Sequence, residues 1–139
     1  MYKHILLAAD GSDNSVRAAQ EAIKLAQLTE HSLIEIVLVA SFDKARTEVL
    51  HASSSEGLML ERRRKIANIE QLLQAAGIRY DVTILKGDPG PEIVAYANDK
   101  AVDIVVLGSR GLNGLQQMVL GSVSHKVMKR VTCPALIVK

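Results

Sequence analysis

The chain has 139 residues, a length that fits one domain of ordinary size, spanning residues 1–139, and leaves no room for a second core. Hydrophobic residues make up 48% and charged residues 23%, which predicts a folded globular protein and excludes a disordered chain. Lysine and arginine number 17 against 15 acidic residues, so the net charge of +2 gives no electrostatic reason to expect a nucleic-acid partner or a membrane surface.

Aromatic residues are only 3% of the chain and tryptophan is absent, which argues against sites that stack bases or sugars. The single cysteine, Cys133, cannot form an intramolecular disulfide, and no Cys and His spacing resembles a zinc site. Apolar runs are of strand length and none precedes a signal-peptide cleavage pattern. We therefore expect a cytoplasmic protein with an aliphatic core.

Apolar runs of strand length alternate with helical patterns along the whole chain, which predicts βα units that build a buried parallel sheet. The expected strands are residues 4–9, 33–39, 78–85, 102–107 and 135–138. Helices are expected between these strands. The first follows the turn at residues 10–13, the next spans residues 58–76, another begins near the cap candidate Asp88, and the last spans residues 122–130. The polar stretch at residues 41–56 has no recognisable role.

The turn after the first strand is the first candidate for chemistry. In an open parallel sheet, ligands bind beyond the carboxyl ends of the strands, where the strand order reverses. Asp10, Gly11 and Ser12 follow the first strand directly, so the Asp10 carboxylate is expected at the rim of such a crevice. The alternative is that Asp10 or Ser12 only caps the next helix, and the two interpretations are evenly matched on this segment.

The loop after the fourth strand is richer in glycine. Gly108 and Gly111 precede Gly121, which opens the last helix together with Ser122 and Ser124. Glycines leave backbone amides accessible and a helix N-terminus carries partial positive charge, so this segment predicts a phosphate cradle. The alternative is a structural turn in which Ser122 is the N-cap. The lysine of a P-loop and the dinucleotide fingerprint are both missing, which disfavours a P-loop NTPase.

These residues resemble the ATP-binding branch of the universal stress protein family. The pattern G-x2-G-x9-G-[ST] of that branch is matched at every spacing by Gly108, Gly111, Gly121 and Ser122. The resemblance continues through the segments at residues 10–12, 87–89 and 133–138. It implies an α/β fold with one five-stranded parallel sheet in the order 3-2-1-4-5, doubly wound with helices on both faces.

The resemblance also implies which residues form the nucleotide site. Those expected on the adenine and ribose side are Ala8, Asp10, Val39, Leu107 and Gly108. Those expected on the triphosphate side are Gly111, Gly121, Ser122, Val123 and Ser124. Whether Arg110 reaches a phosphate or points into solvent stays open.

The sequence thus favours an ATP-binding stress protein, with Mg²⁺ expected beside the triphosphate. Hydrolysis needs a positioned base, an activated water and charge stabilisation, and the sequence offers Asp10 and Asp88 only as possible metal or water partners, so any ATP hydrolysis is expected to be slow. One alternative is an interaction module that binds no nucleotide, and another is an enzyme of the adenine-nucleotide α-hydrolase type. The uncharged edge strand Ala135–Val138 further predicts a homodimer formed by antiparallel pairing of that strand.

Overall fold

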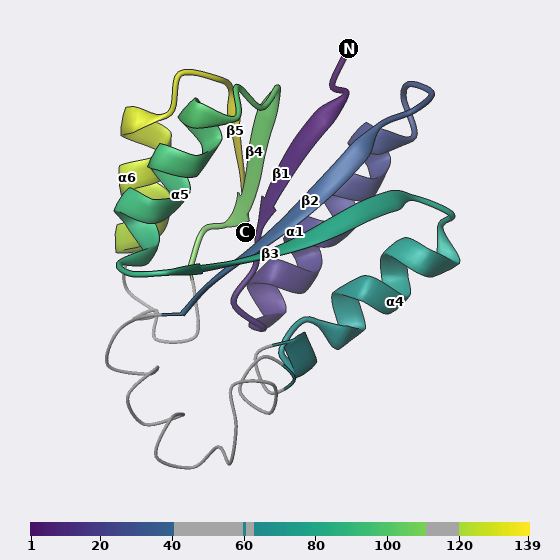
Figure 1. Cartoon of the computed structure of the whole chain (residues 1–139), viewed down its shortest axis with the longest axis horizontal. Coiled ribbons are helices and arrows are strands. Elements are labelled where there is room, and N and C mark those ends of the chain that lie inside the picture. The colour runs from purple at the N-terminus through teal and green to yellow at the C-terminus, as the bar shows by residue number, and fades with distance from the viewer. Residues whose placement is uncertain (41–59, 61–62, 111–119) are drawn as a thin grey trace.

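A computed structural model describes residues 1–40, 60, 63–110 and 120–139. The elements in chain order are β1 (His4–Ala8), α1 (Asp13–Ala26), β2 (Leu33–Ala40), α4 (Ala67–Ala75), β3 (Arg79–Lys86), α5 (Pro89–Asp99), β4 (Ile104–Gly108), α6 (Ser122–Arg130) and β5 (Ala135–Val138) (Figure 1). The strands form one five-stranded sheet in the order β3-β2-β1-β4-β5, and every neighbouring pair is parallel. The predicted fold class and strand order are confirmed.

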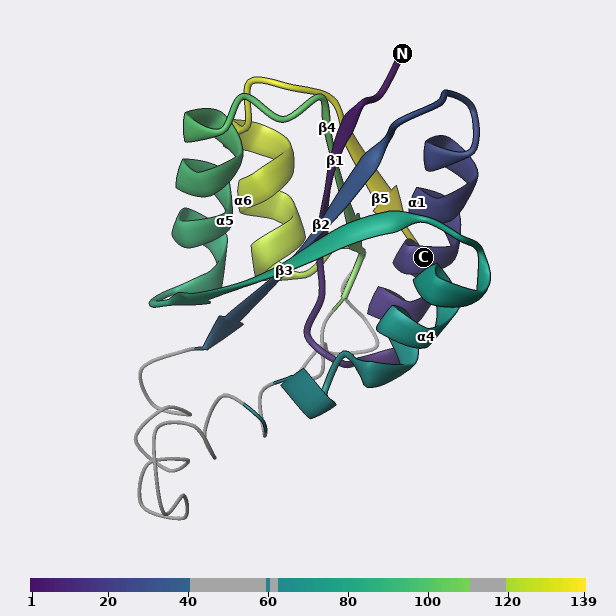
Figure 2. The ribbon, with the colours of Figure 1, turned by 45° about the vertical axis from the view of Figure 1, so that its right-hand side comes forward.

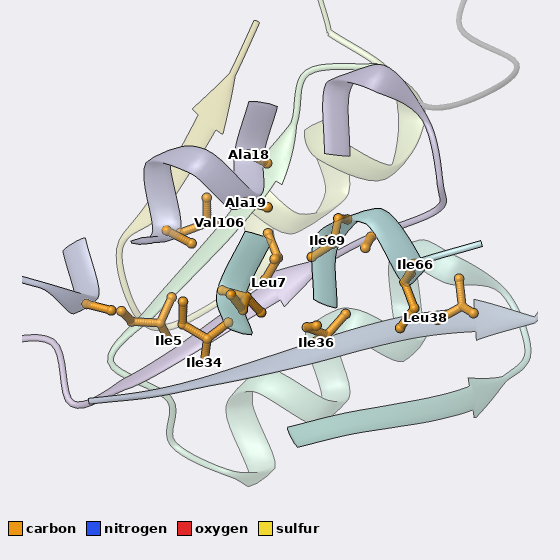
Figure 3. Packing of buried hydrophobic residues seen from close by; sticks show 14 of the residues in the cluster. Ile5, Leu7, Ala18, Ala19, Ile34, Ile36, Leu38, Ile66, Ile69 and Val106 are labelled. Carbon is orange, nitrogen blue, oxygen red and sulfur yellow. The ribbon is translucent and has the colours of Figure 1, made fainter. Parts of the chain in front are cut away.

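The central strands are apolar on both faces because helices cover both sides of the sheet. Figure 2 shows α1 and α4 on one side and α5 and α6 on the other. Ile5 and Leu7 of β1 point into the core beneath α1 and α4, whereas Leu6 and Ala8 point toward α5 and α6. The core beneath α1 and α4 is the larger of the two, and its buried side chains are aliphatic. Ile34 of β2 is one of these side chains (Figure 3). Strand alternation thus turns a continuous apolar run into two cores.

Local signals place the helices close to their predicted bounds. Ser12 is the N-cap of α1, and its hydroxyl oxygen accepts a hydrogen bond from the amide of Ser15. Gly77 has a φ of 68° just after α4, the left-handed conformation that glycine adopts most easily at a helix end. Asp88 occupies the N-cap position of α5, with Pro89 in the first turn.

The predicted helix over residues 58–76 is wrong in its continuity. Arg63 and Arg64 are helical, a turn follows at Lys65 and Ile66, and α4 begins only at Ala67. The turn is tight, because the amide of Ile66 donates to the carbonyl of Arg63 at 3.1 Å. It buries the Ile66 side chain completely and lays the Lys65 backbone against Gly11. Tertiary packing therefore interrupts the helix at a point where the sequence pattern alone predicts that it continues.

Candidate functional site

The carboxyl ends of β1 and β4 lie side by side in the centre of the sheet. The next strand after β1 is its neighbour β2 on one side, and the next strand after β4 is its neighbour β5 on the other, so the strand order reverses between β1 and β4 (Figure 1). This is the topological switch point at which open α/β sheets bind ligands. Among the predicted site residues, Ala8 ends β1, while Leu107 and Gly108 end β4. Val39 lies near the end of β2, two residues beyond the last pairing with β1.

The turn after β1 fixes Asp10 at the rim of the switch point. Its carboxylate accepts a hydrogen bond from the amide of Ser12 at 2.9 Å, and Gly11 between them has a φ of 86°. Asp10 is half-buried. Because Ser12 makes the capping contact with α1, the capping role falls to Ser12 and not to Asp10.

The end of β4 packs directly on the first turn of α1. A Cβ atom added at Gly108 would lie 2.7 Å from the Cβ atom of Asn14, so only glycine fits at this crossing. The Asn14 side-chain amide donates to the carbonyl of Arg110 at 2.7 Å. Sequence reasoning had not singled out Asn14, because its contacts with residues 108 and 110 arise only in the folded sheet.

The N-terminus of α6 is attached to the residues that follow β4. The amide of Gly121 donates to the carbonyl of Ser109 at 2.7 Å. The hydroxyl of Ser124 donates to the carbonyls of Gly108 and Ser109 at 3.0 and 2.9 Å. Ser124 is buried, with an exposed fraction of 2%. Its hydroxyl therefore holds the start of α6 against the end of β4.

The first backbone amides of α6 follow Gly121. The N-cap is Gly121, so the interpretation of Ser122 as the N-cap is wrong. His125 donates the first intrahelical hydrogen bond, to the carbonyl of Gly121 at 3.0 Å. The amides of Ser122, Val123 and Ser124 precede it and have no acceptor within the helix, as at any helix start. Gly111, predicted for the same side of the site, lies outside the described residues.

The family model described as "Universal stress protein family" matches residues 1–139. The chain belongs to the universal stress protein family. The universal stress protein YxiE of Bacillus subtilis is 36% identical over 157 residues, and the match covers 100% of both chains.

Two solved structures of the family extend the comparison. The structure of MJ0577, a universal stress protein of Methanocaldococcus jannaschii, superposes with a TM-score of 0.84 at 31% identity, covering 100% of this chain and 96% of that one. A universal stress protein solved in complex with cAMP has the same fold, with a TM-score of 0.76 at 22% identity and coverage of 99% and 97%. Members of this fold family therefore include nucleotide-bound proteins.

This universal stress protein also has a polar cluster that sequence reasoning missed. The buried Glu35 of β2 accepts hydrogen bonds from Thr83 of β3 and His4 of β1, both at 2.8 Å, and from the hydroxyl of Tyr96 of α5. The four side chains line part of a surface hollow of about 760 Å³. Burial alone would raise the pKa of Glu35, but the three hydrogen bonds outweigh it and hold that pKa below its ordinary value.

Three further observations concern Cys133, metal ligands and membrane spans. Burial raises the pKa of the Cys133 thiol, which favours the protonated and unreactive form. Within residues 1–40, 60, 63–110 and 120–139, His, Cys, Asp and Glu side chains form no group of three that could hold a metal ion. Across the same described residues, no helix combines the length and the apolar character that a membrane span requires.

Proposed function

We propose that this protein binds ATP at the switch point between β1 and β4 and acts as a nucleotide-dependent regulatory protein of the stress response. The observation that carries the proposal is the attachment of the α6 N-terminus to the end of β4 by the Gly121 amide and the Ser124 hydroxyl. Through this attachment, the amides of the helix start, which suit phosphate oxygens, would lie beside a ligand bound at the switch point.

The residues of the site suit the two ends of the nucleotide. Asp10 in the turn after β1, with the backbone near Ala8 and Val39, would bind the adenosine side. The amides of residues 122–124 would bind the phosphates. A Cβ atom at Gly121 would lie 3.2 Å from the carbonyl oxygen of Ser109. A side chain larger than a methyl group would therefore crowd the space between Gly121 and Ser109.

Mg²⁺ would accompany the triphosphate, because this ion keeps several waters and binds through phosphate oxygens with one or two carboxylates. The half-buried carboxylate of Asp10, held by the Ser12 amide, is a suitable ligand at the rim. Hydrolysis would be slow, since it requires a positioned base and stabilisation of charge on the phosphates.

The same proposal includes a homodimer through β5. All four residues of Ala135–Val138 are apolar and partly exposed. On the β4 side, β5 accepts hydrogen bonds from Val105 and Ser109 at the carbonyls of Pro134 and Val138. Because backbone groups alternate along a strand, the amide and carbonyl of Ile137 point to the open edge. A second copy of β5 running antiparallel would satisfy them.

A thermal-shift titration tests the binding proposal. ATP at about 100 times its Kd should add about 2.7 kcal/mol of stability, and GTP should add less. Gly121→Val should lose the ATP response while its unliganded melting temperature shows that it folds. No response of the parent protein to millimolar ATP would reject the proposal and favour an interaction module that binds no nucleotide. A Gly121→Val variant that binds ATP as tightly as the parent would show that the phosphates bind elsewhere.

A further inference from the structure

Asn14 connects two segments that are far apart in the sequence. It lies in the first turn of α1, against Gly108 at the end of β4. Its Nδ2 atom donates to the carbonyl of Arg110 at 2.7 Å, and its Oδ1 atom accepts a hydrogen bond from the guanidinium of Arg17. A carbonyl only accepts and a guanidinium only donates, so these two neighbours fix the orientation of the Asn14 amide.

Arg17 continues this connection to the end of β5. Its Nε atom donates to the main-chain oxygen of Lys139, the residue after β5, at 2.8 Å. The amide of Ser109 also donates to the carbonyl of Val138 at 2.7 Å. The residues after β4 are therefore joined to the end of β5 twice, once directly and once through the two side chains of α1.

We propose that Asn14 and Arg17 are positioning residues, which hold the backbone of residues 108–110 in place and couple it to the end of β5. The effect on ATP rests on the proposed function, because the amides that would bind phosphate are attached to this backbone through the Ser109 carbonyl. A ligand that orders residues 108–110 would also order the end of β5. By thermodynamic linkage, pairing of β5 with a second copy would then raise the affinity for the ligand.

Amide hydrogen exchange of the unliganded protein, followed by NMR, tests the coupling without any nucleotide. The amides of Ser109 and Gly121 should exchange about tenfold faster in Arg17→Ala and in Asn14→Asp, since each variant removes a hydrogen bond that supports this backbone. Asn14→Asp keeps the acceptor for Arg17 and loses the donor to the Arg110 carbonyl. The two side chains act in series, so the double variant should exchange no faster than the faster single variant.

Lys24→Ala is the matched control. Lys24 is an exposed cation of the same helix, paired with Glu21 at 3.0 Å, so its loss changes the charge of α1 equally without touching residues 108–110. In this control the exchange rates of the Ser109 and Gly121 amides should match those of the parent protein. In Arg17→Lys these rates should lie between those of Arg17→Ala and those of the parent. Parental exchange rates in Arg17→Ala and Asn14→Asp would overturn the coupling.

Calorimetry with ATP then separates positioning from a purely structural contact. ATP should bind about fivefold more weakly to Arg17→Ala than to Lys24→Ala, in line with the loss of one hydrogen bond. Faster exchange with unchanged ATP affinity would overturn the positioning role. A parent protein that binds no ATP would overturn the proposed function alone, and the coupling would then be decided by the exchange rates.

Discussion

Gly108→Ala should destabilise the protein because the new methyl group has no space at the crossing of β4 and α1. An added Cβ atom would lie 2.7 Å from the Cβ atom of Asn14 and 3.1 Å from its carbonyl carbon. Carbon atoms in contact prefer a separation of about 3.5–4.0 Å. The end of β4 and the first turn of α1 would therefore have to move apart by about 1 Å, which would also lengthen the hydrogen bond from Asn14 to Arg110.

Overpacking of this kind reduces the free energy of unfolding by about 1–3 kcal/mol. For a chain of this size, each kcal/mol lowers the melting temperature by about 4 °C, so a decrease of about 4–12 °C is expected. The movement would also separate the two sides of the proposed nucleotide site. Scanning calorimetry and urea denaturation of the unliganded variant measure the first effect, and ATP titration measures the second.

Gly121→Ala is the control for Gly108→Ala. Its added Cβ atom would lie 3.2 Å from the Ser109 carbonyl oxygen and 3.5 Å from the Cα atom of Arg110, and its φ of −70° suits alanine. We expect a loss of less than about 1 kcal/mol, partly offset by the reduced freedom of the unfolded chain. A Gly108→Ala protein as stable as the parent, or a larger loss in Gly121→Ala, would refute the packing argument.

Two further predictions concern the polar cluster and the edge strand. A carboxyl whose pKa is lowered on folding stabilises the protein above its ordinary pKa of 4.5, and this contribution is lost as the pH falls through the lower folded-state value. The free energy of unfolding of Glu35→Gln should therefore be about 1–3 kcal/mol lower than that of the parent protein at neutral pH. Between pH 5 and pH 3 the variant should lose less stability than the parent. Parallel pH profiles of the two proteins in urea denaturation would contradict this. Ile137→Pro removes an amide that faces the open edge of β5 and should shift a dimer toward monomer in analytical ultracentrifugation. A monomeric parent at tens of micromolar, or a folded variant that stays fully dimeric, would argue against pairing through β5.

Strand and helix positions could be predicted where local pattern and tertiary environment agree. The bounds of α6 and β5 match their predicted ranges, because a glycine opens the helix and Pro134 precedes a short apolar strand. Periodicity could not give the strand order, since it reports which faces are buried and not which strands are neighbours. That order came from the family resemblance. The break at Lys65 and Ile66 could not be predicted because the burial of Ile66 in the core and the contact of Lys65 with Gly11 arise only in the folded protein.

The sequence predicts which residues follow β1 directly and which open α6, but several side-chain contacts near them could not be predicted. Ser124 is predicted on the triphosphate side, and the structure adds that its hydroxyl donates to the carbonyls of Gly108, the last residue of β4, and of Ser109. Asn14 and Glu35 were not singled out at all. Each has partners on elements distant in sequence, so no spacing rule brings them together before the fold is known.

The strand order sets how the protein can be made on the ribosome. Ile5 in the middle strand pairs with Ile34 on one side and with Ile104 on the other. Of these three strands the middle one is synthesised first, and β4 follows only after β2 and β3, so the nascent chain has an apolar strand edge without its partner until β4 is made. Such edges associate with other chains. Until β4 is made, this edge of β1 is therefore open to other strands, whereas the finished sheet pairs it with β4.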